Sequence, residues 1–396
     1  MQNASQQSLL HVTTSIPVDS ASATLVGRVW RPGIGPAVVT LRGDQVIDIT
    51  SRTIATTRDV TEHPTPAALM REAKGEAIAT IEALLLNSDE TARDPAQPWL
   101  LSPVDLQAIK AAGVTFVVSL IERVIEEQAR GNPARASEIR AEIGRLIGDD
   151  LSKLVPGSDE AMRLKAHLIE RGAWSQYLEV GIGPDAEIFT KAQVLSSVGT
   201  GAMIGLHPVS TWNNPEPEIV ILINSEGSIV GATLGNDVNL RDVEGRSALL
   251  LGKAKDNNAS AAIGPFIRLF DDAFGLDDVK SADVSLEVLG TNNFRLAGRS
   301  RMSEIARPPE AIAAAAIGQH HQYPDGLALY LGTMFAPAED RHAPGKGFTH
   351  ELGDIVSISS PRLGTLVNRV GLSTEVAPWS FGLADFMRNL AGRGLL

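Results

Sequence analysis

The segment NNPEPEIVILIN, from Asn213 to Asn224, places Glu216 and Glu218 directly before an apolar run. Proline restricts the residue before it to extended backbone, so the chain enters the predicted strand Ile219–Ile223 already extended. Residues two apart in an extended chain point to the same face. We therefore expect the two carboxylates to lie side by side at the start of a strand.

A hairpin is predicted after this strand. Glu226-Gly227 has the composition of a two-residue turn, which would set Ser225 opposite Ser228 and start a returning antiparallel strand, Ile229–Leu234. Counting back along the pair then decides which residues of the two strands face each other.

This register sets Glu216 opposite Asp237 and Glu218 opposite Gly235, and directly opposed residues of an antiparallel pair share a face. Three carboxylates would converge at one end of the hairpin. A bulge or a longer loop would shift the pairing by one residue.

Three carboxylates at close range raise one another's pKa unless a cation lies between them. An all-oxygen ligand set without cysteine or a neighbouring histidine is typical of Mg²⁺, Mn²⁺ or Ca²⁺ rather than zinc. His207, His320 and His321 lack further ligands at a metal-site spacing, so we place them outside the site. An isolated Glu-Pro-Glu is more often a solvated strand end, and the motif alone leaves both interpretations open.

Composition restricts the class of partner. Lys and Arg number 35 against 47 Asp and Glu, and nucleic-acid binding depends on basic surfaces, so a small molecule is the expected partner. The absence of cysteine excludes disulfides and thiolate chemistry. The first residues lack the pattern of a signal peptide, and no apolar run could span a bilayer; we expect a cytoplasmic protein without a membrane or nucleic-acid partner.

The chain is predicted to be an α+β protein of two domains. Residues 23–50 alternate short β-branched runs with Gly and Pro turns, and Ala67–Leu86 has helical spacing. A proline-rich joint, Asp94–Pro103, suggests a small N-terminal α/β domain over residues 1–97 and a catalytic domain over 98–396.

Within the larger domain, helices are predicted at Phe116–Gly131, Ala134–Ile147 and Asp159–Arg171. From Tyr177 to Val370 the sequence is dominated by short apolar runs between turn residues, which predicts a β-rich core with a helical insertion. Most charges on the first helix fit a solvated face, with Ser119, Glu122 and Arg123 as the exceptions.

The segments around and after Asp237, GNDVNLRDVEG and LLGKAKDNNASAAIGPFI, together with the later GDIVSISSPRLGTL, resemble the fumarylacetoacetate hydrolase superfamily. The resemblance extends from Pro98 to about Val370 and implies a mixed β-sandwich or β-roll catalytic domain. In that family a Glu-x-Glu strand start and a following Asp hold a divalent metal, which implies Mg²⁺, or alternatively Mn²⁺, on Glu216, Glu218 and Asp237.

Two further segments, GVTFVVSLIER and PDAEIFTKAQVLSSVG, resemble the branch of the superfamily that dehydrates 2-keto-3-deoxy sugar acids, most of all pentonates of the xylonate or arabinonate type. That resemblance implies proton transfer by Glu187 and a substrate-reaching lysine after glycine, Lys253, which we expect to be the base. Val118 stands where an arginine is usual, and Ser360 where threonine is usual. The implied substrate-binding residues are Ser119, Arg123, Lys191, Arg241 and Ser360.

The implied reaction is the metal-dependent dehydration of a 2-keto-3-deoxypentonate to 2-oxoglutarate semialdehyde. One alternative is a hydrolase that cleaves a 2,4-diketo acid, although the helix Phe116–Gly131 lacks the histidine typical of that branch. A second is a non-catalytic binding protein with the same fold. The family also implies a homodimer or homotetramer. For Lys191, an ion pair facing solvent is an equally good interpretation.

Overall fold

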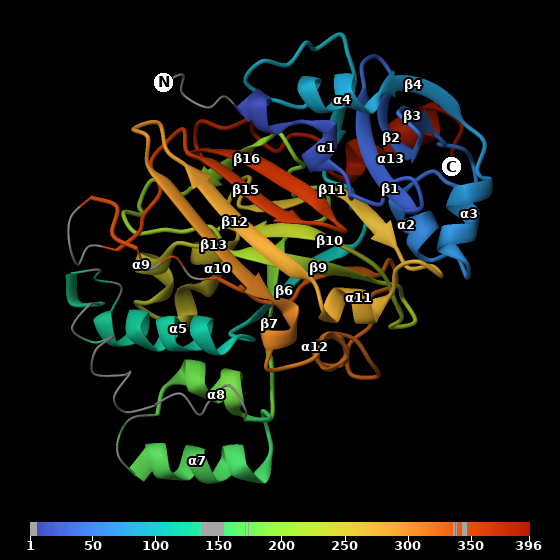
Figure 1. The fold of residues 1–396 in the computed structure, drawn as a ribbon. Coiled ribbons are helices and arrows are strands. Elements are labelled where there is room, and N and C mark those ends of the chain that lie inside the picture. The colour runs from blue at the N-terminus through green and yellow to red at the C-terminus, as the bar shows by residue number, and fades with distance from the viewer. Residues whose placement is uncertain are drawn as a thin grey trace.

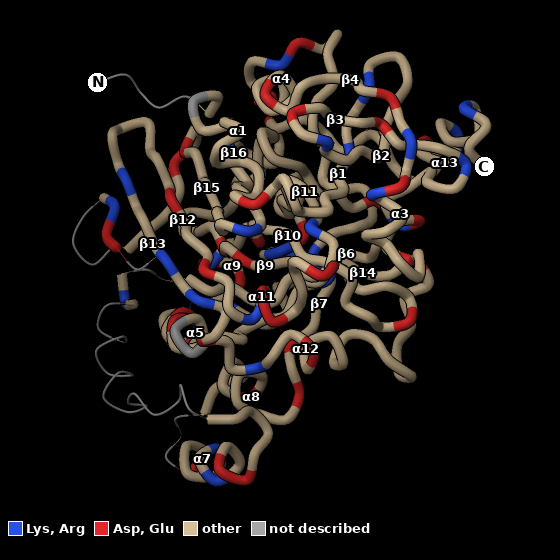
Figure 2. The backbone as a smooth tube through the Cα atoms, turned by 45° about the vertical axis from the view of Figure 1, so that its right-hand side comes forward, with Lys and Arg blue, Asp and Glu red and all other residues tan. Residues whose placement is uncertain are grey.

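The computed structural model describes residues 6–130, 132, 134–136, 139, 154–170, 172, 174–335, 337, 339–342 and 347–396. Within them, eleven strands form one mixed sheet and five form a second (Figure 1). No helix in these ranges is long and apolar enough to cross a membrane. Charged residues of both signs are spread over the chain (Figure 2).

The larger sheet runs through the whole molecule and contains the predicted hairpin. In spatial order its strands are β4 (Glu76–Thr80), β3 (Gln45–Asp48), β2 (Gly35–Arg42), β1 (Leu25–Arg31), β11 (Ala261–Leu269), β10 (Ile229–Asp237), β9 (Pro217–Ile223), β14 (Leu327–Tyr330), β6 (Ala108–Gly113) and β7 (Glu187–Ala192), with β5 (Trp99–Leu101) beside β1. The smaller sheet has the order β13 (Arg295–Arg301), β12 (Asp283–Leu289), β15 (Ile355–Ser360), β16 (Gly364–Leu372) and β8 (Met203–Leu206).

The helices surround these sheets. They are α1 (Val12–Ser15), α2 (Thr57–Thr61), α3 (Pro66–Glu72), α4 (Ile81–Asn87), α5 (Val117–Ala129), α7 (Asp159–Glu170), α8 (Gln176–Ile182), α9 (Arg241–Glu244), α10 (Leu251–Lys255), α11 (Leu276–Lys280), α12 (Pro309–Ala316) and α13 (Leu383–Gly392). The predicted helices at Phe116–Gly131 and Asp159–Arg171 correspond to α5 and α7, whereas most of Ala134–Ile147 lies outside the described residues. Figure 1 shows α7 and α8 projecting from the body beyond α5.

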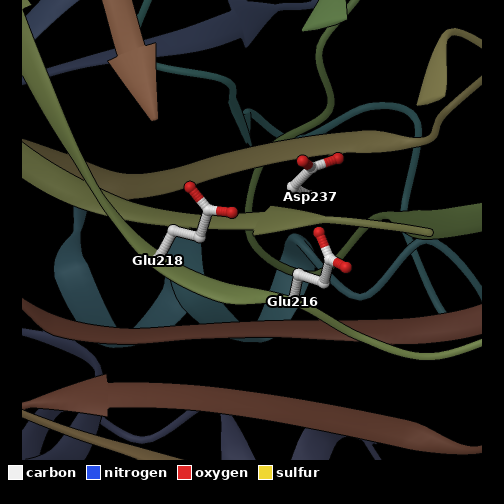
Figure 3. Close-up of side chains that lie close together, drawn as sticks. All are labelled: Glu216, Glu218 and Asp237. Carbon is white, nitrogen blue, oxygen red and sulfur yellow. The ribbon is translucent and has the colours of Figure 1, made fainter. Parts of the chain in front are cut away.

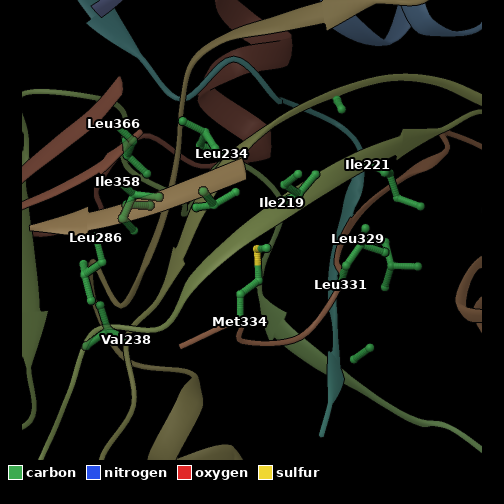
Figure 4. Packing of buried hydrophobic residues seen from close by; sticks show 14 of the residues in the cluster. Ile219, Ile221, Leu234, Val238, Leu286, Leu329, Leu331, Met334, Ile358 and Leu366 are labelled. Carbon is green, nitrogen blue, oxygen red and sulfur yellow. The ribbon is translucent and has the colours of Figure 1, made fainter. Parts of the chain in front are cut away.

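The two sheets pack face to face over the main hydrophobic core. Ile219 and Leu234 of the larger sheet lie against Leu286, Ile358 and Leu366 of the smaller one (Figure 4). Burying each such side chain stabilises the folded state by about 1.5 to 3 kcal/mol. The odd-numbered side chains of β9 therefore hold the β9–β10 hairpin against the smaller sheet.

The other face of the hairpin belongs to a second core, where Val220 and Leu222 lie with Tyr330. Side chains alternate along a strand, so Glu216 and Glu218 share this second face. The carboxylates are therefore on the side of the larger sheet that the smaller sheet does not cover.

The predicted register of the hairpin is confirmed at its open end. Glu218 pairs with Gly235, and the N–H of Asp237 donates to the carbonyl of Glu216 at 3.0 Å. Glu216 and Asp237 are thus opposed as expected.

The predicted turn is wrong by one residue. Asn224 donates to the carbonyl of Ser228 at 3.0 Å, and Ile223 pairs with Ile229, so the loop is longer than Glu226-Gly227 alone. A bulge at Val230 takes up the extra residue and returns the register to the predicted one. The two deviations cancel before the carboxylates are reached.

The N-terminal residues continue the larger sheet, because β1 pairs with β11 and β5 returns to pair with β1. The C-terminal α13 packs there as well, with Asn389 donating to the carbonyl of Ile34 at 2.7 Å. The boundary between residues 97 and 98 stays a prediction. The single helix predicted for Ala67–Leu86 is wrong: β4 separates α3 from α4, because this segment pairs with the free edge of β3.

Candidate metal centre and active site

Three buried carboxylates converge at the open end of the β9–β10 hairpin (Figure 3). One oxygen from each of Glu216, Glu218 and Asp237 lies within 4.8 Å of the others, and all three residues are buried. We call these residues the carboxylate trio. Such spacing suits one hard divalent cation bound by oxygen.

Glu218 differs from the other two members of the trio in its surroundings. Its Oε2 accepts the N–H of Gly332 at 2.7 Å, and among the described residues it makes no ion pair. Burial, together with the negative charges of Asp237 and Glu216, raises the pKa of Glu218 well above its ordinary value. A carboxylate in this position is stabilised by a cation placed between it and its neighbours.

Two buried lysines contact the other two members of the trio, Glu216 and Asp237. Lys255 in α10 forms ion pairs with Glu216 and, at 3.0 Å, with Asp237. Lys191 in β7 lies 2.7 Å from the other Asp237 oxygen. Burial alone would raise the pKa of Asp237, but these lysines outweigh it and lower that pKa. Lys255 keeps its proton, because its carboxylate neighbours raise its pKa despite burial.

Lys191 also forms hydrogen bonds with the surrounding backbone. It donates to the carbonyl of Val238 at 3.1 Å and to the carbonyl of Lys255. Its side chain is fully buried, so the interpretation of Lys191 as an ion pair facing solvent is wrong. Lys191 joins β7, β10 and α10 around Asp237.

Arg123 links the trio to the helices α5 and α9. It forms ion pairs with Glu216, with Glu126 at 2.6 Å and with Glu244 at 3.1 Å. Burial disfavours the charged guanidinium, but these carboxylates raise its pKa well above the usual value. Burial also raises the pKa of Glu244 to about 7, against the opposing effect of Arg123.

Glu187 lies at the edge of this network. It begins β7, directly opposite Gly113 of β6, and it is only partly buried. Burial raises its pKa, while Lys255 and Arg123 oppose the shift and the charges of Glu216 and Asp237 add to it. Glu187 therefore holds a proton to higher pH than an ordinary glutamate and still has access to solvent.

The electrostatic balance of the network fits a divalent cation. Its carboxyl groups outnumber its cations, and uncompensated buried negative charge is costly. The acids are Glu122, Glu126, Glu187, Glu216, Glu218, Asp237 and Glu244, and the bases are Arg123, Lys191, Arg241 and Lys255.

Known proteins resemble this chain in sequence. No family model matches the chain. It is 32% identical over 184 residues to 2-dehydro-3-deoxy-D-arabinonate dehydratase of Saccharolobus solfataricus, a match over 46% of this chain and 58% of that protein. It is 29% identical over 268 residues, 68% of this chain and 73% of the relative, to a protein of Haloferax volcanii named as a probable 2-keto-3-deoxyxylonate dehydratase.

Solved structures share the fold. A 2-keto-3-deoxy-D-arabinonate dehydratase in its apo form superposes with a TM-score of 0.61 at 21% identity, over 88% of this chain and 99% of the other. The same enzyme complexed with magnesium and 2,5-dioxopentanoate gives the same score and coverage. The chain is thus similar in sequence and in fold to dehydratases of 2-keto-3-deoxy sugar acids, the branch of the fumarylacetoacetate hydrolase superfamily that its motifs resemble. The expected fold is confirmed at the level of a mixed α/β protein with two sheets that matches these dehydratase structures.

The structure corrects the prediction for Lys253. Lys253 is exposed on α10, while Lys255, two residues later, is buried against the trio. Residues two apart on a helix point about 200° apart, so the family's glycine-lysine pattern selected the residue on the solvent side.

Ser360 is also placed away from the trio. It pairs with Gly364 at a turn whose Arg362 carbonyl accepts a hydrogen bond from Arg268. Arg268 is opposite Ala232, whereas Asp237 is opposite Ala261, so this turn lies at the far end of β10. Five residues of strand separate the two ends by roughly 16 Å, which excludes Ser360 from contact with a molecule at the trio.

Among the described residues, two side chains, Glu126 and Arg123, stand between Arg241 and the trio. Arg241 contacts Glu126 at 2.6 Å and Glu122 at 3.1 Å, so it holds the helices rather than the centre. Ser119 donates to the carbonyl of Thr333, next to the Gly332 N–H that contacts Glu218. It therefore supports the strand end beside the trio.

Sequence reasoning missed Lys255, Glu126 and Glu244. The sequence predicts Glu126 on the solvated face of its helix, but it is 1% exposed, because Arg123 and Arg241 hold it from two sides. The spacing Lys-Ala-Lys offered a signal for Lys255. No local sequence pattern indicates that Glu244 belongs to the network, because its partner Arg123 lies on another helix, α5.

Proposed function

We propose that this protein dehydrates a 2-keto-3-deoxypentonate, of the xylonate or arabinonate type, to 2-oxoglutarate semialdehyde. The observation that carries the proposal is the buried carboxylate trio beside two buried lysines and a proton-holding Glu187. The names of its relatives supply the substrate class.

The reaction removes one proton from carbon 3 and the hydroxyl from carbon 4, releasing water. The unsaturated keto acid that remains then isomerises: hydrogens leave carbon 5 and its hydroxyl and are added at carbons 3 and 4, which leaves the aldehyde. Proton carriers and charge stabilisation at the keto oxygen are therefore the chemical requirements.

The trio would hold the metal, with Mg²⁺ the first choice and Mn²⁺ the second, and the bound ion would polarise the keto group of a chelating 2-keto acid. Glu187 is the proposed proton carrier. Protonated, it can give its proton to the leaving hydroxyl, and as a carboxylate it can accept one. Burial raises its pKa, so the protonated form persists to a higher pH than in an ordinary glutamate.

We assign Lys255 to the place predicted for Lys253, in a revised role. Because its carboxylate neighbours keep it protonated, it is a fixed positive charge and a poor base. We assign it to the stabilisation of negative charge that develops on substrate oxygens.

The test is a substrate panel. The purified protein is incubated with Mg²⁺ and 2-keto-3-deoxyxylonate, 2-keto-3-deoxyarabinonate or a 2,4-diketo acid, with and without EDTA, and products are identified by mass spectrometry. Semialdehyde formed only from the deoxypentonates, and lost with EDTA, is the expected result. Cleavage of the diketo acid alone would identify a hydrolase, and no product from any substrate would contradict both enzymatic functions.

Three variants test the assignment of residues. Glu187→Gln should lower kcat by about 100-fold or more, and Lys255→Met should also reduce kcat strongly. The exposed Lys253→Met, two residues along the same helix, should leave turnover unchanged. Equal effects of the two lysine substitutions would refute the role of Lys255.

A further inference from the structure

We propose that Gly113 is a positioning residue that sets where the carboxyl group of Glu187 lies, and that the missing side chain at this position is required for turnover. This inference rests on the proposed function for its kinetic consequence. Its structural basis is independent of the substrate.

The contact between the two residues is direct. Gly113 and Glu187 are opposed in the antiparallel pair β6–β7, and the Glu187 carboxyl group folds back over the Gly113 backbone. A Cβ atom added at residue 113 would lie 1.9 Å from Oε2 of Glu187 and 2.7 Å from its Cδ. Nonbonded atoms cannot approach so closely, so any side chain at position 113 displaces this carboxyl group.

Backbone conformation does not explain the glycine. Gly113 is outside the positive-φ region in which this chain places many of its other glycines. An alanine could therefore adopt the same backbone, and in a strand it is ordinarily no worse than glycine. The three atoms nearest to an added Cβ all belong to the Glu187 side chain, so the conflict is with that side chain.

The surrounding structure prevents Glu187 from retreating with its backbone. The pairing Ala111–Phe189 and Ala112–Ile188 fixes the strand register. Arg307 donates to the carbonyl of Gly183 at 2.6 Å and to further carbonyls at the end of α8 and in the loop that leads into β7.

The segment around Arg307 also holds the chain just after Gly113. The N–H of Ala306 donates to the carbonyl of Thr115 at 2.8 Å. With both backbones fixed from outside, a new methyl group at residue 113 can be accommodated only by rotating the Glu187 side chain.

The experiment compares Gly113→Ala, Glu187→Asp and the double variant with wild type. The control is Gly382→Ala, where an added Cβ meets nothing within 4 Å. We expect Gly113→Ala to lower kcat by about 10- to 100-fold, with a smaller change in KM. Mg²⁺ affinity should be kept, because the trio lies on β9, β10 and the residue that precedes β9. Urea unfolding of each variant verifies that it folds.

The double variant, Gly113→Ala with Glu187→Asp, is the decisive test. Aspartate is one methylene shorter and withdraws the carboxyl group from the added methyl, so Glu187→Asp should cost much less in the Gly113→Ala background than in wild type. This non-additivity is the signature of a direct contact. Additive effects, or a Gly113→Ala kcat within twofold of wild type, would overturn the proposal.

A second readout does not depend on turnover. In protein labelled with ¹³C at glutamate carboxyl groups, the Glu187 resonance is assigned from Glu187→Gln, and its titration is followed by NMR. Gly113→Ala should shift its midpoint, whereas Gly382→Ala should not. If wild type converts no deoxypentonate, the proposed function is refuted but the positioning role is not. An unchanged titration midpoint of Glu187 in Gly113→Ala would refute the positioning role.

Discussion

Replacing Lys255 with methionine should make the stability of this protein depend strongly on magnesium. Lys255 contacts Asp237 at 3.0 Å in a buried environment. At an effective dielectric constant of about 20, that attraction amounts to about 5 kcal/mol before desolvation is subtracted. The ion pair with Glu216 adds to it.

The net loss is smaller than the Coulomb attraction. Removing one partner of a buried ion pair typically costs about 3 to 5 kcal/mol. Glu216 keeps Arg123 and Asp237 keeps Lys191 as remaining cations, so the lower end, about 3 kcal/mol, is expected in the absence of metal. A divalent ion at the trio supplies the missing positive charge and should return most of this loss.

The assay is urea unfolding of wild type, Lys255→Met and Lys253→Met, each with EDTA and with saturating Mg²⁺. Lys253 is exposed, so its substitution should change the free energy of unfolding by no more than about 0.5 kcal/mol. The stabilisation by Mg²⁺ should be largest in Lys255→Met. Equal losses for the two lysine variants, or a loss in Lys255→Met that Mg²⁺ leaves untouched, would refute the reasoning.

Three more outcomes are expected. Glu218→Gln should abolish measurable Mg²⁺ binding by calorimetry, whereas Glu226→Gln on the exposed turn of the same hairpin should preserve it; retained binding in Glu218→Gln would remove Glu218 from the site. The pKa of Glu244 is raised by burial to about 7 from 4.5, so the folded state keeps a proton that the unfolded state releases. In EDTA, wild type should therefore lose up to about 3 kcal/mol of stability relative to Glu244→Gln as pH rises from about 4.5 to 7, and parallel pH profiles in urea unfolding would contradict this. Ser360→Ala should keep kcat and KM within about twofold of wild type in the turnover assay, since its turn is at the far end of β10.

The carboxylate trio could be predicted because strand geometry is short-range. Two prolines extend the chain at Glu216 and Glu218, and a period of two puts both carboxylates on one face. Hairpin counting then selected Asp237. The count succeeded although the turn was wrong, because the bulge at Val230 compensated for the longer loop.

The lysine could not be assigned in the same way. Lys253 and Lys255 have the same side chain and differ only in which side of α10 they occupy, and the side that is buried depends on what packs against the helix. Glu126 raises the same difficulty on α5. Its burial follows from Arg123 and Arg241, and no periodicity in the sequence reveals that two arginines will meet there.

The sequence alone determined the members of the carboxylate trio and the resemblance to the superfamily, because local extension, strand alternation and an ordered set of motifs are properties of neighbouring residues. Only the tertiary structure decided which lysine meets the carboxylates, and that Ser360 does not. It also revealed the space at Gly113 that Glu187 occupies. Each of these depends on the packing of elements distant in the chain, which brings a side chain into a buried contact or leaves it in water.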